Sequence, residues 1–186
     1  MRPSHFKKST TFFHLNIPFK TTGYFKQLDW TYLQQNLHKY SVLFNIELQA
    51  LVMMDTHFHL LIGVSDNNEN FFCEDVEKKL SSNTDEGMHC EPITNLAQYL
   101  NAYKYIYNNP VQAGIAQKSE SYPYSSLQIL MGKCSSHCLI ADKMKFIQNP
   151  RRILAWLNSD SKFKDSELKI FAPISSTSSL RVRCNS

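Results

Sequence analysis

Two histidines separated by one residue are the first side chains in this sequence that suggest chemistry. His57 and His59 flank Phe58 in a stretch of mostly apolar residues. If that stretch is a strand, both imidazoles leave the same face of the sheet, because side chains alternate along a strand. Two neighbouring imidazoles are natural ligands for a divalent metal. The same pattern also fits two half-exposed histidines without a metal, so the pair alone leaves both interpretations open.

A tyrosine and an asparagine further along the chain form a second candidate. Tyr105 and Asn109 are four residues apart near the expected end of a helix, so they share one face of it. A tyrosine hydroxyl at such a place can act as a nucleophile, and an asparagine amide oxygen can be a hard metal ligand. Tyr99, Tyr103 and Tyr107 crowd the same stretch. Packing alone therefore also accounts for a tyrosine there.

The spacing of apolar residues predicts the elements that would position these side chains. Two-residue periodicity and β-branched content predict strands, and spacings of three and four residues predict helices. The strands are expected at residues 10–17, 46–52, 57–63 and 88–93, and the helices at residues 30–44, 71–80, 95–108, 126–131, 141–148 and 151–157. Asp29 is expected to cap the first helix, and Pro110 is expected to end the tyrosine-bearing one.

This order of elements predicts an α+β fold. It is a ferredoxin-like antiparallel sheet with helices packed on one face. In this arrangement the His57–His59 pair lies on a central strand, and Tyr105 lies on a following helix.

Composition narrows the function classes. The chain has 186 residues and five glycines, too scattered for a glycine-rich phosphate loop. Its five cysteines are odd in number and irregularly spaced, which favours reduced thiols and a cytoplasmic location over a disulfide framework. The sequence predicts neither a membrane span nor a secretory signal. The net charge is +4. The sequence is basic except at residues 66–91, which contain eight acidic residues and two lysines. A basic body favours a polyanionic partner.

Taken together, three motifs resemble a known family. They are His57-Phe58-His59, then Tyr105-Ile-Tyr-Asn-Asn109-Pro-Val-Gln-Ala-Gly114, then Tyr122-Pro-Tyr-Ser-Ser126. Their sequence and order resemble the HUH-type single-tyrosine transposases, and among these the REP-associated tyrosine transposases. The resemblance covers roughly residues 10–130.

The resemblance implies an enzyme that cleaves single-stranded DNA, with a hairpin as the recognition element, and transfers the cut strand. In this reading His57, His59 and Asn109 hold Mg²⁺ or Mn²⁺. Tyr105 is the nucleophile, forming a covalent 5′-phosphotyrosine and releasing a 3′-hydroxyl. Lys104 is expected to contact a phosphate. The family acts as a monomer or a homodimer, and nothing in the sequence decides between them.

The implied domain plan has three parts. Residues 1–130 form the catalytic domain, with a variable acidic segment at residues 64–92. Residues 131–172 form a short helical extension, and residues 173–186 form a disordered polar tail.

The sequence also departs from the family pattern, and other readings stay open. Residues 64–92 are short and acidic where the family is often basic, and the strand with His14 lacks the Arg-Gly pair that often follows. A degenerate or co-opted protein that binds DNA hairpins without cutting them is therefore the main alternative. A replication initiator or relaxase of the same superfamily is another. A zinc hydrolase with Asp55 as base is a third, and it would not need Tyr105. A weak zinc motif is present at Cys134, His137 and Cys138.

Overall fold

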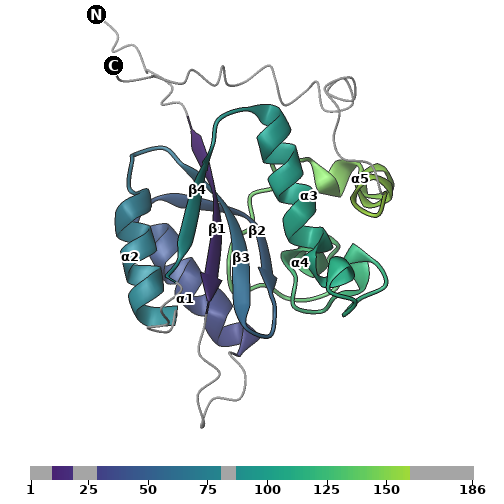
Figure 1. The fold of residues 1–186 in the computed structure, drawn as a ribbon, viewed down its shortest axis with the longest axis horizontal. Coiled ribbons are helices and arrows are strands. Elements are labelled where there is room, and N and C mark those ends of the chain that lie inside the picture. The colour runs from purple at the N-terminus through teal and green to yellow at the C-terminus, as the bar shows by residue number, and fades with distance from the viewer. Residues whose placement is uncertain (1–9, 19–28, 81–86, 160–186) are drawn as a thin grey trace, which may run out of the picture.

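A four-stranded antiparallel sheet is the centre of the fold (Figure 1). The computed structural model describes residues 10–18, 29–80 and 87–159. The strand order is β2-β3-β1-β4. The strands are β1 (Thr11–Pro18), β2 (Ile46–Met53), β3 (His57–Val64) and β4 (His89–Ile93). Every strand boundary lies within one residue of its predicted position. The predicted α+β class is therefore confirmed, with His57 and His59 on the central strand β3.

Two helices cover one face of this sheet, as the ferredoxin-like prediction requires. They are α1 (Trp30–Leu43) and α2 (Glu69–Leu80), and they complete the order β1-α1-β2-β3-α2-β4. Asp29 caps α1 as predicted, since its carboxylate accepts a hydrogen bond from the Tyr32 N–H at 2.8 Å. The side chains that fill this layer include Leu33 and Leu37 of α1 and Phe72 and Val76 of α2, all fully buried.

The tyrosine-bearing helix lies on the opposite face, which the one-face prediction did not include. This helix, α3 (Leu96–Gln112), packs against a second buried cluster that contains Ala50 and Leu61 from the sheet. Successive strand residues alternate between the two clusters, as Leu60 belongs to the first and Leu61 to the second. Strand β3 is buried over nearly its whole length because helices cover both of its faces.

The end of α3 differs from its prediction. The helix does not stop before Pro110 but continues to Gln112. Gly114 closes it in a left-handed conformation with φ of 71°, the region that glycine enters without a steric penalty. Its N–H donates to the Val111 carbonyl at 3.0 Å, and the Ile115 N–H donates to the Pro110 carbonyl at 2.9 Å. These two bonds form a Schellman motif, which satisfies carbonyls at the helix end. Asn109 is consequently held inside a continuous helix.

The chain after α3 returns to the core through short elements. These are η1 (Ser119–Ser121), α4 (Ser126–Leu130), η2 (Phe146–Gln148) and α5 (Pro150–Leu157). The helices expected at residues 126–131 and 151–157 are confirmed, whereas residues 141–148 contain only the 3₁₀ turn η2. The Asp142 carboxylate accepts from the Phe146 N–H at 2.7 Å and from the Ile147 N–H at 3.0 Å, which caps that turn.

The described part of the predicted extension packs on the core between the sheet and α3. Phe146, Ile153 and Leu157 are buried in the same cluster as α3, and the Ala141 N–H donates to the Leu48 carbonyl at 2.7 Å. The domain boundaries at residues 130 and 172 stay predictions. The predicted disordered tail lies outside the described residues. Among the described helices, none has the length and apolar content that crossing a membrane requires.

Candidate functional site

Strand β3 brings the two predicted histidines into contact. Nε2 of His57 lies 3.1 Å from Nε2 of His59. Their rings are perpendicular, with centroids 4.7 Å apart. His59 is buried with 1% of its surface exposed, whereas His57 is half-buried at the start of the strand. The two ring edges that point at each other are therefore the Nε2 edges.

Helix α3 adds the predicted asparagine to the same point. The Asn109 Nδ2 atom lies 3.1 Å from the Nε2 atom of His59. Rotation of the amide by 180° exchanges its nitrogen and oxygen, so either atom can face the histidines. One face of α3 carries Gln98, Ala102, Tyr105 and Asn109 at spacings of three and four residues. A single helical stripe thus supplies both the tyrosine and the amide.

Tyr105 packs edge-on against the histidines. Its ring centroid lies 5.4 Å from that of His59 and 5.7 Å from that of His14, in T-shaped geometry with both. Tyr105 is 43% exposed, while Tyr103 and Tyr107 on the same helix are 2% and 1% exposed. Burial raises the pKa of Tyr103 and Tyr107 above the usual value of 10.0. The neighbouring tyrosines are core residues, and Tyr105 is the one that solvent and a substrate can reach.

His14 is a site residue that the sequence analysis did not assign. Its Nε2 atom lies 3.3 Å from Nδ1 of His59, the ring nitrogen that faces away from His57. Strand β1 pairs with β3 so that Asn16 is opposite His59. His14 and Asn16 share a face because they are two residues apart. The signal was a polar alternation, His-x-Asn, inside an apolar strand, and it becomes informative once the register of β1 against β3 is known.

The predicted ligand set fits one small divalent cation. Two ligands at right angles on a metal with bonds of about 2.1 Å are roughly 3.0 Å apart. The Nε2 atoms of His57 and His59 are 3.1 Å apart, and the Asn109 amide is 3.1 Å from the latter. Imidazole nitrogens and an amide oxygen suit Mn²⁺, and Mg²⁺ accepts them less readily. His14 does not join this set, because it faces the other nitrogen of His59.

Burial keeps the histidines neutral. It lowers the pKa of His59 from 6.5 to about 3, helped by the charges that His57 and His14 would carry. Burial also lowers the pKa of His57. The pKa of His14 is lowered by burial too, against an opposing effect from the Glu91 carboxylate. Neutral imidazoles keep a lone pair, which a metal ligand needs.

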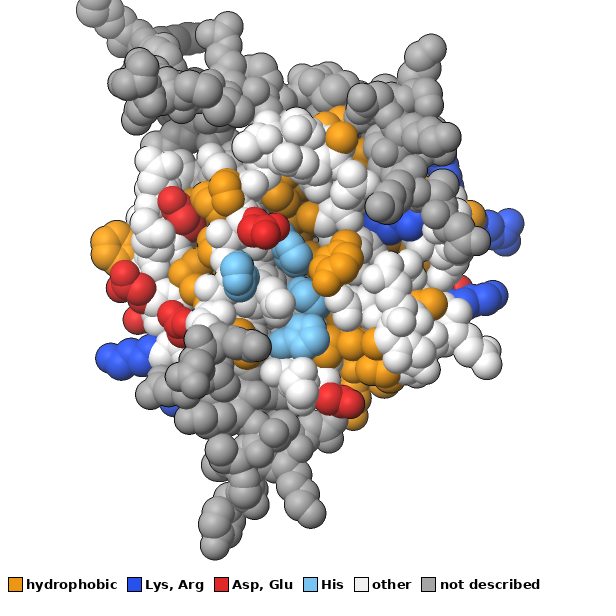
Figure 2. Space-filling view, in the orientation of Figure 1, with side chains coloured by type: hydrophobic (Ala, Val, Ile, Leu, Met, Phe, Trp, Pro, Cys, Tyr) orange, Lys and Arg blue, Asp and Glu red, His pale blue; other side chains and the backbone are white. Residues whose placement is uncertain are grey.

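An open pocket of about 630 Å³ lies beside Tyr105, between α3 and β4. Its polar lining comes from His14, Asn16, His59, His89 and Glu91 on the sheet, and from Gln98, Asn101 and Tyr105 on α3. Figure 2 shows the histidines gathered at the centre of this face, with acidic side chains nearby and Lys and Arg toward the edges. The pocket is thus polar and aromatic, and the basic side chains of this face lie away from it.

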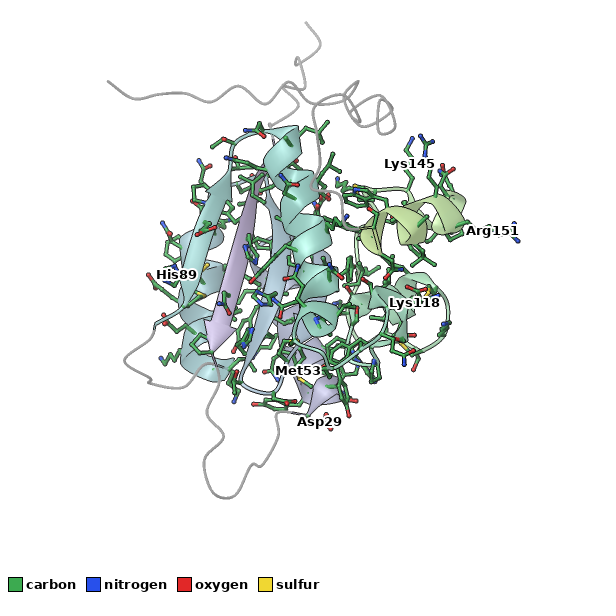
Figure 3. The ribbon with its side chains drawn as sticks, turned by 45° about the vertical axis from the view of Figure 1, so that its right-hand side comes forward. Asp29, Met53, His89, Lys118, Lys145 and Arg151 are labelled. Atoms are coloured by element: carbon green, nitrogen blue, oxygen red, sulfur yellow. The ribbon has the colours of Figure 1, made fainter. Side chains whose placement is uncertain are left out.

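The structure does not bring Lys104 to the site. Its side chain is 9% exposed, and its ammonium donates to the Ser159 carbonyl at 2.7 Å and lies over the Trp156 ring at 5.6 Å. This lysine therefore binds the end of α5, and its position does not support the predicted phosphate contact. The labelled basic residues Lys145 and Arg151 extend outward near α5 (Figure 3).

The acids that the structure describes in the segment at residues 64–92 lie mostly behind the sheet. Helix α2 carries Glu69, Glu74, Asp75 and Glu77 on the face opposite α3. Glu91 of β4, by contrast, lines the pocket beside Tyr105. Most of this negative charge is therefore separated from Tyr105 by the sheet.

The Tyr122-to-Ser126 motif is structural in this fold. The Tyr122 hydroxyl donates to the Met53 carbonyl at 2.7 Å, and the Ser126 hydroxyl accepts from the Leu51 N–H at 2.9 Å and contacts the Tyr107 hydroxyl at 2.8 Å. These hydrogen bonds attach the motif to the outer edge of β2, the edge strand next to β3.

The zinc alternatives find no support in this geometry. In the three described ranges of the chain, no three His, Cys, Asp or Glu side chains are placed to hold one ion. Cys138 is buried in the first core cluster and Cys134 is exposed. Asp55 lines a separate cavity of about 470 Å³ with Tyr122 and Tyr124. The set with Asn109 is of a different kind, because its third ligand is an amide.

One of the solved structures that this chain resembles binds a nucleic-acid hairpin. It is described as a REP-associated tyrosine transposase bound to a REP hairpin. It matches with a TM-score of 0.49 and 19% identity, and the match covers 76% of this chain and 91% of that one. No protein-family model and no curated protein matches the sequence. A likeness of this extent leaves the function to be argued from the site itself.

Proposed function

We propose that this protein cleaves single-stranded DNA through Tyr105 and transfers the cut strand, with a divalent cation held by His57, His59 and Asn109. The observation that carries the proposal is the convergence of these four side chains. A reachable tyrosine packs on a buried histidine whose Nε2 edge also meets a second histidine and an amide. Packing alone does not require two neutral imidazoles and an amide to meet at one point.

The residues of the chain have separate roles in this reaction. Tyr105 Oη forms a bond to phosphorus while the bond from phosphorus to the 3′ oxygen breaks. The phenol loses one proton and the leaving 3′ oxygen gains one, so the step is balanced. Mg²⁺ or Mn²⁺, when bound, would polarise the phosphate and offset developing negative charge. Because one phosphodiester replaces another, the 5′-phosphotyrosine can react with a new 3′-hydroxyl without ATP.

Helix α3 positions the nucleophile relative to the ligands. Tyr105 and Asn109 are one turn apart on the same stripe, and the Schellman motif after Gln112 keeps that turn helical. Reacting groups held on a rigid element need little reorganisation before attack. The same helix thus supplies the nucleophile and one ligand in fixed register.

Single-stranded DNA is the substrate that suits this surface best. An open pocket lined by Tyr105 and imidazole rings offers faces on which unpaired bases stack. The solved neighbour is described as bound to a REP hairpin, and we extend that substrate class to this chain as part of the proposal. The Glu91 carboxylate repels a phosphate placed beside Tyr105, so a hairpin bound elsewhere on the surface without cleavage is the second candidate function.

A covalent-adduct assay tests the proposal. Labelled single-stranded hairpins are incubated with Mg²⁺ or Mn²⁺ and the wild-type protein, Tyr105→Phe or Tyr32→Phe, and are resolved on a denaturing gel. Tyr32 is a matched control because it is 40% exposed and lies on α1, on the other face of the sheet. We expect an adduct with wild type and Tyr32→Phe that is lost with Tyr105→Phe. Hairpin binding without any adduct would instead establish the second candidate, and an adduct that survives Tyr105→Phe would exclude this nucleophile.

A further inference from the structure

Three neighbouring strands place an acid and two imidazoles in a row that leads into the site. Strand β1 lies between β3 and β4. Glu91 of β4 is directly opposite His14 of β1, and His14 contacts His59 of β3. Glu91 and His59 therefore lie on opposite sides of His14. This row is separate from the ligand set, since it reaches His59 through Nδ1 and not through Nε2.

We propose that His14 is a positioning residue that fixes the tautomer of His59, so that the bare Nε2 of His59 points at His57 and Asn109. The metal that this arrangement serves rests on the proposed function above. The tautomer itself is a property of the metal-free protein and can be measured without DNA.

The hydrogen-bond directions follow from the capacity of a neutral imidazole. Each neutral ring has one N–H donor and one acceptor nitrogen. In the orientation that the amide has here, the Asn109 Nδ2 group donates to Nε2 of His59 at 3.1 Å, so this Nε2 accepts, and the amide has to rotate to offer its oxygen to a metal. The proton of His59 is then on Nδ1, from which it donates to His14 Nε2 at 3.3 Å. His14 must in turn carry its own proton on Nδ1.

Glu91 favours this direction over the reverse one. Its carboxylate lies on the side of His14 away from His59, where a negative charge stabilises a proton on the far nitrogen. With that nitrogen protonated, His14 Nε2 is left as an acceptor. His57 is consistent with this pattern. Its Nδ1 can accept from the Thr56 hydroxyl at 3.0 Å, and its Nε2–H can then donate to the bare Nε2 of His59 at 3.1 Å in the metal-free protein.

Partners of this kind orient metal-binding histidines generally, and their loss typically weakens metal affinity by about 10- to 100-fold. Here the partner is another imidazole, and an acid stands opposite it on the neighbouring edge strand. The pocket beside Tyr105 is therefore coupled to the ligand set through His14, which lines it.

Nitrogen-15 NMR on the metal-free full chain near neutral pH tests the tautomer. In the wild type we expect His59 to carry its proton on Nδ1. His14→Phe keeps a ring but removes the acceptor, and we expect the His59 proton to move to Nε2. His14→Gln restores an acceptor oxygen, and we expect the wild-type tautomer to return. His89→Phe is the control, since His89 lines the same pocket but makes no hydrogen bond to His59.

Titration with Mn²⁺ gives the second readout. We expect affinity to fall about 10- to 100-fold in His14→Phe and to recover in His14→Gln. A wild-type His59 protonated on Nε2 would overturn the inference, and so would His14→Phe with unchanged tautomer and affinity. If His14→Phe does not fold, the wild-type tautomer and the affinity of His14→Gln decide. Absence of a DNA adduct with the expected tautomer would refute the proposed function alone.

Discussion

A buried hydrogen bond between Tyr99 and Gln49 fixes α3 to the sheet, and its contribution can be measured. The Tyr99 hydroxyl donates to Gln49 Oε1 at 2.5 Å, with 3% and 0% of the two residues exposed. Gln49 lies at the irregularity between Leu48 and Ala50 in β2. Gly63 leaves room for it, because a Cβ there would lie 2.8 Å from Gln49 Nε2. Tyr99 is six residues before Tyr105 on the same helix, so this bond helps to place Tyr105.

The size of the effect follows from what each change leaves unpaired. Tyr99→Phe leaves the buried Gln49 oxygen without a donor, and Gln49→Met leaves the buried Tyr99 hydroxyl without an acceptor. Each single change is therefore expected to cost about 1–3 kcal/mol of unfolding free energy. The double variant leaves neither group unpaired, since both become apolar and keep their approximate shape. It should therefore cost less than either single change, which gives a coupling of at least about 1–3 kcal/mol.

Urea unfolding of the four proteins in the cycle measures this coupling. Gln34→Met combined with Tyr99→Phe is the matched control, because Gln34 is also buried but contacts the residue 137–138 turn on the α1 side of the sheet. That pair should be additive within about 0.5 kcal/mol. If Tyr99→Phe and Gln49→Met are equally additive, the bond does not couple α3 to β2 and the reasoning fails.

Three further predictions concern the site and its helix. The pKa of His59 is lowered from 6.5 to about 3. Neutral His59 therefore costs no stability above pH 6.5. As the pH falls below 6.5, the free energy of unfolding decreases, because His59 binds a proton in the unfolded chain that it does not bind in the folded one. In chelator-treated protein, the free energy of unfolding should fall by about 2 kcal/mol more in wild type than in His59→Gln between pH 7 and pH 5, and an equal fall in the two proteins would contradict this. Gly114→Ala should cost about 1 kcal/mol in urea unfolding, since φ is 71° while the added Cβ meets nothing within 4 Å; an unchanged midpoint would contradict this. Lys104→Met should lower stability by about 1 kcal/mol but leave the salt dependence of hairpin binding unchanged, because its ammonium binds the end of α5; a smaller salt slope would show that it contacts phosphate after all.

The strands and the first helices were predictable because each obeys one local rule. Strand β3 begins at His57 as the alternation predicts, and Asp29 caps α1 where a capping residue precedes the first apolar stripe. The antiparallel pairing of β2 with β3 follows from the short connection between them, whereas β1 pairs with β3 and β4, which lie far from it in the chain. The placement of α3 on the other face was not predictable in this way. Strand β3 is buried on both faces, so its sequence does not indicate which face a given helix covers.

The errors on α3 have a different origin. Pro110 predicts a helix end because it lacks an N–H, but burial of Pro110 and the two bonds after Gln112 support another turn. Lys104 was assigned to phosphate because it neighbours Tyr105 in sequence. Adjacent helical residues point about 100° apart, however, and the partner that binds Lys104 lies 55 residues away. Contacts of that separation leave no periodic signal.

The residue pairs of the site and His14 also differ in whether their positions could be predicted from the sequence. His57 with His59, and Tyr105 with Asn109, each form a pair within one element, so spacing alone places both members on one face. His14 reaches the site only through the register of β1 against β3, in which Asn16 is opposite His59. A slip of one residue would move His14 to the face covered by α1 and α2. The apolar residues Leu15 and Ile17 prevent that slip, because both are fully buried on the α1 side. The core packing of β1 therefore determines that His14 faces His59, and the hydrophobic pattern of the strand was the available evidence for it.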